Sequence, residues 1–170
     1  KLATERIGGR FIFEQLPKTT TQQELDARVA MYNNDPNVDG LIVQRPITGL
    51  TARVALSKDI DGFEKNSPYE VPIAMAMFTL LKDVDYRNKK IVIVGRGETA
   101  GKPIAYTLTK MGVAFEVAHS KTTNLEELCL VANIIISCVG KRNILRHSMV
   151  SNKTILIGVG LHTENGKLKT

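Results

Sequence analysis

A short apolar run followed by three closely spaced glycines constrains this chain more than any other feature. Residues 90–94 read Lys-Ile-Val-Ile-Val, and four of these five are β-branched. Such a run is typical of a strand that is buried on both faces of a parallel sheet. Gly95, Gly97 and Gly101 follow, and Pro103 stands where a helix would begin. A strand, a glycine loop and a helix in this order predict a backbone that closely approaches a phosphate.

Two known phosphate-binding motifs can be compared with this loop. A P-loop requires Ser or Thr after its lysine, but Pro103 follows Lys102 here, which argues against that motif. The dinucleotide fingerprint G-x-G-x-x-G is missed by one position, because Gly101 comes one residue late. The strand before the loop and the helix after it still favour dinucleotide binding. A tight turn between strand and helix, with no ligand, remains the alternative.

The residues after the next expected strand indicate which dinucleotide is bound. In NAD sites an acidic residue about 20 positions on holds the ribose hydroxyls. The expected strand over residues 114–118 is followed instead by His119, Ser120 and Lys121, and Arg96 lies in the glycine loop. A hydroxyl and two cations suit a 2′-phosphate, so we expect NADP rather than NAD, with NAD still possible. The alternative for both cations is ordinary solvated surface charge.

The rest of the chain alternates between strand and helix patterns. In the first 50 residues we expect a βαβ unit whose sheet is parallel, with strands over 11–13 and 38–43. Thr20 or Thr21 is expected to cap the helix between them, with Gln23 or Glu24 near its third position, and residues 33–37 end it. A further helix is expected over residues 72–84. From residue 89 onward the pattern predicts a doubly wound nucleotide-binding sheet, with strands over 90–94, 114–118, 133–139 and 154–159 and helices over 103–111 and 124–131.

The composition excludes several other classes of protein. The net charge of +6 comes from scattered Lys and Arg, and there is no Trp, so a nucleic-acid groove is not indicated. No apolar run reaches the ~20 residues of a membrane span, and no signal peptide is visible. Cys129 and Cys138 lie in apolar segments and are expected to be buried thiols in a reducing, cytoplasmic compartment, with no disulfide and no metal site.

Five motifs in register resemble those of the methylenetetrahydrofolate dehydrogenase/cyclohydrolases of one-carbon metabolism. The family's G-R-S-x-I-V-G-x-P corresponds to residues 95–103, and its H-S-K-T matches residues 119–122 in full. Its A-V-G-K-P corresponds to residues 138–142, which read Cys-Val-Gly-Lys-Arg. Upstream, G-I-L-V-Q-L-P corresponds to residues 40–46, and K-D-V-D-G-F to residues 58–63. Each motif alone is weak, but their common order covers essentially the whole chain.

The resemblance implies a two-lobe α/β enzyme with folate bound between the lobes. It implies oxidation of 5,10-methylenetetrahydrofolate by NADP⁺, hydrolysis of the methenyl product to 10-formyltetrahydrofolate, and a cytoplasmic homodimer that serves purine biosynthesis. By motif match, Gln44 works with a lysine and Asp61 anchors the pterin. The residues that fall where the family holds NADP are Gly95, Arg96, Gly97, Ser120 and Leu161. We expect a folate lobe over residues 1–70 and a Rossmann-type NAD(P) domain over residues 71–170.

Several departures from the family pattern bear on these expectations. The family's Y-x-x-x-K helix would place its lysine one residue before Lys1, or at Lys1 after a one-residue shift. Gly97 replaces a serine, which removes a hydroxyl near the expected 2′-phosphate, and Gly158 replaces an aspartate. The interval between Asp61 and Pro72 is also short. We expect a chain that is incomplete at both ends; the alternative is a shortened, non-catalytic relative that binds a nucleotide or folate.

Overall fold

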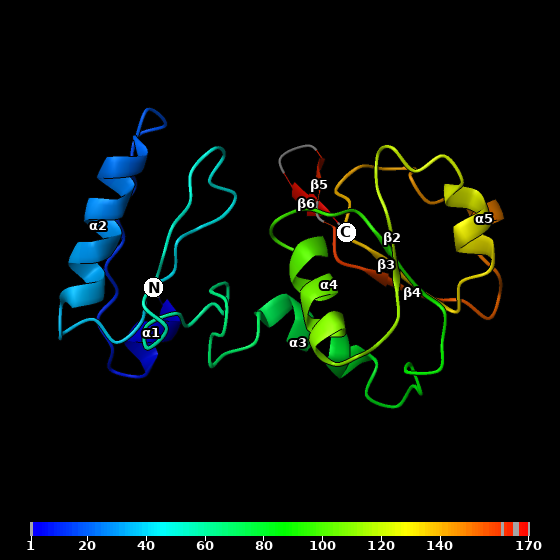
Figure 1. Cartoon of the computed structure of the whole chain (residues 1–170), viewed down its shortest axis with the longest axis horizontal. Helices are drawn as coiled ribbons and strands as arrows, with labels where there is room; N and C mark the ends of the chain where they lie inside the picture. The colour runs from blue at the N-terminus through cyan, green and yellow to red at the C-terminus, as the bar shows by residue number, and fades with distance from the viewer. Residues whose placement is uncertain (1, 161, 165–166, 170) are drawn as a thin grey trace.

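The computed structural model describes residues 2–160, 162–164 and 167–169. Figure 1 shows two bodies side by side along the long axis. One body contains α1 (Leu2–Arg6), α2 (Gln22–Asn34) and the irregular chain up to about residue 60. The other contains all the strands and the remaining helices, α3 (Pro72–Leu80), α4 (Gly101–Lys110), α5 (Leu125–Leu130) and the 3₁₀ turn η1 (His147–Met149).

A four-stranded parallel sheet forms the centre of the second body. Its strands are β1 (Ile91–Val94), β2 (Glu116–Ala118), β3 (Ile134–Ser137) and β4 (Ile155–Gly158), in the order β2-β1-β3-β4. Val94 lies opposite Ala118 on one side and Ser137 on the other, so the carboxyl ends of three strands are level. The chain passes from β1 to β2 on one side and then crosses back to β3 on the other side of β1, and ligands of open α/β sheets bind at such a switch point. The predicted α/β fold with a Rossmann-type parallel sheet is confirmed.

The sheet is covered on both faces, as the continuous apolar pattern of β1 requires. Ile91 and Ile93 pack on the side of α3 and α4, in a cluster that also holds Ile104 and Leu108. Val92 and Val94 belong to a second cluster, with Cys129 of α5. All four residues of β1 are at most 2% exposed, so alternate side chains fill two separate cores.

Two further features complete the description of the second body. β5 (His162–Glu164) and β6 (Lys167–Lys169) form a separate antiparallel hairpin. α3 ends at Leu80 rather than at residue 84, because the buried Leu81 ends the helix and turns the chain toward β1. Within the described ranges, no helix has the length and apolar character that a membrane crossing requires.

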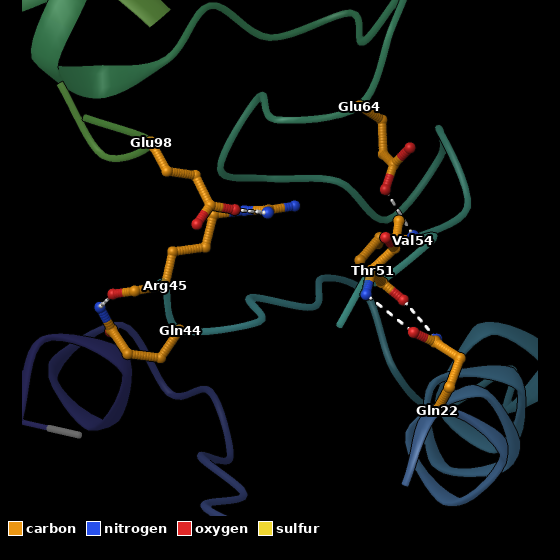
Figure 2. A network of polar contacts seen from close by, with 7 residues as sticks. All are labelled: Gln22, Gln44, Arg45, Thr51, Val54, Glu64 and Glu98. Carbon is orange, nitrogen blue, oxygen red and sulfur yellow. Dashed lines mark hydrogen bonds and ion pairs between the residues drawn. The ribbon is translucent and has the colours of Figure 1, made fainter. Parts of the chain in front are cut away.

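The predicted cap of α2 is confirmed and resolves to Thr21 and Glu24. The Thr21 hydroxyl accepts from the Glu24 backbone N–H at 3.3 Å, and the Glu24 carboxylate accepts from the Thr21 N–H at 2.8 Å. Gln22 then makes a reciprocal pair with the backbone of Thr51, at 2.7 and 2.9 Å (Figure 2). The start of α2 is therefore tied to a segment 29 residues further along the chain.

Replacing Thr21 with alanine removes the side-chain half of this cap. We expect the Thr21→Ala variant to lose about 1 kcal/mol of unfolding free energy, as is usual for helix caps. Urea denaturation followed by circular dichroism measures this loss. Thr19→Ala is the matched control, because Thr19 is exposed and precedes the helix. Equal stabilities of the two variants would contradict the role of the cap.

The expected βαβ unit of the first 50 residues is wrong. Residues 11–13 and 38–43 form no strand; the pairing in this part of the described chain is one parallel bridge between Leu41 and Asp59. Phe13 is 74% exposed, so the apolar run 11–13 does not enter the small cluster around Leu25 and Val29. A strand needs a neighbour to satisfy its N–H and C=O groups, and the folded segments provide none here.

Candidate functional site

Gly95 joins the carboxyl ends of three strands. It follows β1, is buried, and has a φ of +104°, a conformation that favours glycine. Its N–H donates to the Ala118 carbonyl at the end of β2, at 2.8 Å. A Cβ at this position would lie 2.8 Å from the Val139 side chain, just after β3. The loops after β1, β2 and β3 therefore meet at the switch point of the sheet.

The other two glycines of the loop have opposite surroundings. A Cβ on Gly101 would lie only 2.1 Å from the Gly95 carbonyl oxygen, so this glycine permits a direct contact of backbone with backbone. A Cβ on Gly97 would meet nothing within 4 Å, and Gly97 is exposed. The N-cap residue of α4, Ala100, provides no side-chain cap. The loop thus presents open space over Gly97 and a helix start without a side-chain cap, although the Lys102 N–H already donates to the Gly97 carbonyl and Pro103 has no N–H. The positive end of the helix dipole still suits a dinucleotide phosphate.

The segment after β2 forms a tight turn beside this loop. The Thr122 hydroxyl accepts from the His119 N–H at 2.9 Å, and the His119 carbonyl accepts from the Thr122 N–H at 2.8 Å. The turn leaves Ser120 exposed, and Arg96 of the glycine loop is also exposed. Both residues are therefore accessible to a ligand at the carboxyl edge of the sheet. Leu161, the fifth expected cofactor residue, lies outside the described residues.

A buried carboxylate organises the turn that carries Asp61. Asp59 is 2% exposed, and its two oxygens accept from the backbone N–H groups of Phe63 and Glu64, at 3.3 and 2.9 Å. Glu64 in turn accepts from the Val54 N–H at 2.8 Å (Figure 2). Sequence reasoning passed over Asp59, although it stands two positions from Asp61 in the same motif.

Asp61 lies half-buried at a small polar pocket. Arg45, Asp59, Asp61, Phe63 and Glu64 line this pocket together with three aliphatic side chains, and its volume is about 10 Å³, room for roughly one water molecule. Burial raises the pKa of the Asp61 carboxyl, and the nearby Asp59 raises it further, while the charge of Arg45 acts in the opposite direction. Asp61 is thus a carboxylate at low solvation, which strengthens any hydrogen bond that it accepts.

Gln44 is placed near this pocket but outside it. Its side chain is exposed, and its amide donates to the Arg45 carbonyl at 3.3 Å (Figure 2). The structure therefore places Gln44 and Asp61 in the same part of the first body, without a direct contact between them. Whether Lys1 meets Gln44 lies outside the described residues.

Arg45 is the site residue that sequence reasoning missed. Its guanidinium forms an ion pair with Glu98 of the glycine loop, and Figure 2 shows the two side chains reaching toward each other. The same guanidinium lies 4.8 Å from the centre of the Phe63 ring. A signal for Arg45 was available in the sequence, because it stands where the resembling motif has leucine.

The two cysteines are not part of this site. Both are free thiols; Cys129 is buried in the α5 cluster, and burial raises the pKa of Cys138 to about 11. Within the part of the chain that the structure describes, no group of three or more His, Cys, Asp or Glu side chains is arranged to hold a metal ion.

Comparison with known families covers both bodies. Residues 71–170 match the model of the tetrahydrofolate dehydrogenase/cyclohydrolase NAD(P)-binding domain, and residues 1–61 match that of the catalytic domain of the same family. The chain belongs to the tetrahydrofolate dehydrogenase/cyclohydrolase family. The resemblance noted from the five motifs is confirmed.

Individual members of the tetrahydrofolate dehydrogenase/cyclohydrolase family are similar along nearly the whole chain. The bifunctional protein FolD of Polaromonas naphthalenivorans is 32% identical over 184 residues, which cover 98% of this chain and 66% of that protein. FolD of Lactobacillus gasseri is 34% identical, with 96% and 64% covered. The crystal structure of the Campylobacter jejuni FolD dehydrogenase/cyclohydrolase superposes with a TM-score of 0.83 at 30% identity, covering 98% of this chain and 66% of that one. The chain thus spans just under two thirds of the length of these relatives.

Proposed function

We propose that this protein oxidises 5,10-methylenetetrahydrofolate with NADP⁺ and hydrolyses the methenyl product to 10-formyltetrahydrofolate. The observation that carries the proposal is that the glycine loop at the switch point of the sheet is joined, through Glu98 and Arg45, to the pocket of Asp61. The proposed cofactor loop and the half-buried carboxylate of Asp61 are thereby connected. FolD relatives at 32–34% identity are named as bifunctional proteins, which supports the two activities.

We propose residues 71–170 as the NAD(P)-binding domain, with residues 1–70 as the folate lobe. The fit of a dinucleotide rests on the open space over Gly97, the tight packing of Gly95 and the uncapped start of α4. Arg96 and Ser120 are exposed at the adjacent edge, where a 2′-phosphate would be bound, and so favour NADP over NAD. The bound cofactor supplies the hydride acceptor; the protein supplies its position.

In the folate lobe we assign two roles to the motif residues. Asp61 accepts hydrogen bonds from the N–H groups of the pterin edge, because its carboxylate is half-buried and poorly solvated. Gln44 orients water or a lysine in the hydrolytic step, because its side-chain amide is exposed and therefore accessible to either. We further propose a cytoplasmic homodimer that serves purine biosynthesis, on the resemblance alone.

A non-catalytic relative that binds a nucleotide or folate is the second candidate. It is favoured by the pocket beside Asp61, whose volume of about 10 Å³ admits roughly one water molecule and no pterin ring. Under this alternative, the nucleotide domain keeps its ligand while the first lobe has lost its substrate.

Absorbance of the 5,10-methenyl product separates these candidates. The purified protein is given methylenetetrahydrofolate with NADP⁺ or with NAD⁺, and we expect product with NADP⁺. Product with NAD⁺ alone would keep the dehydrogenase and contradict the 2′-phosphate assignment of Arg96 and Ser120. No product with either cofactor, together with calorimetric binding of NADP⁺, would establish the non-catalytic relative instead.

A further inference from the structure

The ion pair of Arg45 with Glu98 connects two segments that are 53 residues apart in the chain. The Arg45 side chain is 16% exposed and that of Glu98 is 34% exposed, so taken together the pair is better shielded from solvent than the Arg28–Glu14, Lys82–Asp83, Lys110–Glu70 and Arg146–Glu126 pairs. Shielded pairs are weakened less by salt and by competing water than exposed ones. Figure 2 shows this pair as the polar link between the Gln44 segment and the glycine loop.

Arg45 is fixed on its own side by two further interactions. Its guanidinium lies over the ring of Phe63, at 4.8 Å from the ring centre, and its charge acts on the carboxyl of Asp61. Phe63 is itself held by the Asp59 carboxylate. The turn that carries Asp61 and Phe63 therefore holds the Arg45 guanidinium in place at the far end of its long side chain.

Glu98 is fixed on the opposite side by the glycine loop. The loop is held at its start, because the Gly95 N–H donates to the Ala118 carbonyl, and it is closely packed at its end, because Gly101 has no room for a Cβ beside the Gly95 carbonyl. The Lys102 N–H also donates to the Gly97 carbonyl at 3.0 Å. The backbone on both sides of Glu98 is therefore held in place, and Glu98 carries its carboxylate from the same loop that would meet the cofactor.

We propose that Arg45 is a positioning residue that, through Glu98, fixes the glycine loop relative to the Asp61 turn and so couples the two binding events. The inference rests on the proposed function, because the coupled ligands are folate and NADP⁺. When the Arg45–Glu98 pair is formed, binding of folate at the Asp61 turn also holds the glycine loop in its binding position. Binding of folate therefore favours binding of NADP⁺, and the reverse holds equally. Leucine at position 45, as in the resembling motif, could form no such pair.

A double-mutant cycle tests whether Arg45 acts through Glu98. We expect folic acid, a folate without the reactive bridge, to tighten NADP⁺ binding at least about fivefold in the wild-type protein, measured by calorimetry. Arg45→Met and Glu98→Gln should each reduce this factor to about one, and their combination should do no more than either alone. Arg45→Lys, which keeps the positive charge, should retain most of the factor by which folic acid tightens NADP⁺ binding. Arg28→Met, which breaks the Arg28–Glu14 pair within the first body, should leave it unchanged.

Three outcomes would overturn the inference. Coupling that survives in Glu98→Gln, or additive losses in the double variant, would show that Arg45 does not act through Glu98. If the wild-type protein binds neither ligand, the proposed function fails, and amide hydrogen exchange of residues 95–101 decides the inference separately. Faster exchange in Arg45→Met and Glu98→Gln, but not in Arg28→Met, supports the link; unchanged exchange refutes it.

Discussion

Replacing Gly101 with alanine is expected to cost about 3 kcal/mol or more of unfolding free energy and to abolish NADP⁺ binding. The added Cβ would lie 2.1 Å from the Gly95 carbonyl oxygen and 2.8 Å from the carbonyl carbon. The neighbouring atoms are backbone, and Gly95 is held by Ala118, so no side-chain rotation relieves the overlap. The loop must therefore move away from the geometry that exposes its N–H groups.

Gly97→Ala is the matched control for this prediction. It makes the same chemical change four residues earlier in the same loop, but its Cβ meets nothing within 4 Å. We expect its stability to stay within about 0.5 kcal/mol of wild type. Guanidinium denaturation and calorimetric titration with NADP⁺ measure the two effects. Similar stabilities of the two variants would show that the close contact at Gly101 is not a constraint.

Asp61→Asn is expected to reduce kcat/KM for methylenetetrahydrofolate by about 100-fold or more, since a charged acceptor of two hydrogen bonds is lost. The same variant should be more stable than wild type at neutral pH. Burial and Asp59 raise the pKa of Asp61 above 3.8, so the ionised carboxylate disfavours the folded state. That penalty is absent below pH 3.8, where the carboxyl is protonated in both states, and it is complete once the pH has risen through the raised pKa.

The stability gain of Asp61→Asn should therefore be smallest well below pH 3.8, grow as the pH rises above 3.8, and level off once the pH has passed the raised pKa of Asp61. Thermal unfolding over this range, beside initial rates of methenyl formation, gives both results. Asp39→Asn is the control, because Asp39 is exposed and lies outside the pocket. A gain that is independent of pH would attribute the effect to packing rather than to charge.

The parts of the fold that could be predicted were those encoded by neighbouring residues. The β1 run, the Thr21–Glu24 cap and the helix after the glycine loop depend on periodicity and local hydrogen bonds, and the structure has all three. The strand expected at residues 11–13 failed for the opposite reason. The apolar composition of residues 11–13 suits a strand, but a strand forms only where another strand lies beside it. No strand pairs with residues 11–13 in the described structure, and Phe13 stays exposed.

The candidate site shows the same division between local and distant information. The glycine loop and the Asp61 turn were recognisable as motifs. The pairing of Arg45 with Glu98 could not be recognised in the sequence. The two residues are 53 positions apart, and many other Lys, Arg, Asp and Glu residues could have formed such a pair. Asp59 and Asp61 stand two positions apart and both line the pocket, and only the folded structure shows that Asp59 is buried and accepts from the backbone N–H groups of Phe63 and Glu64.

The glycine loop folds back on itself, because Gly101 has no room for a Cβ beside the Gly95 carbonyl and the Lys102 N–H donates to the Gly97 carbonyl. These close contacts depend on the number of residues between Gly95 and Lys102. A side chain at the open position 97 can change without a clash, whereas Glu98 is held by Arg45 and the number of residues in the loop is constrained. Substitutions at open positions of this loop can therefore change its ligand contacts one residue at a time. A single insertion or deletion would instead disrupt the packing of Gly101 on Gly95 and the bond from Lys102 to Gly97.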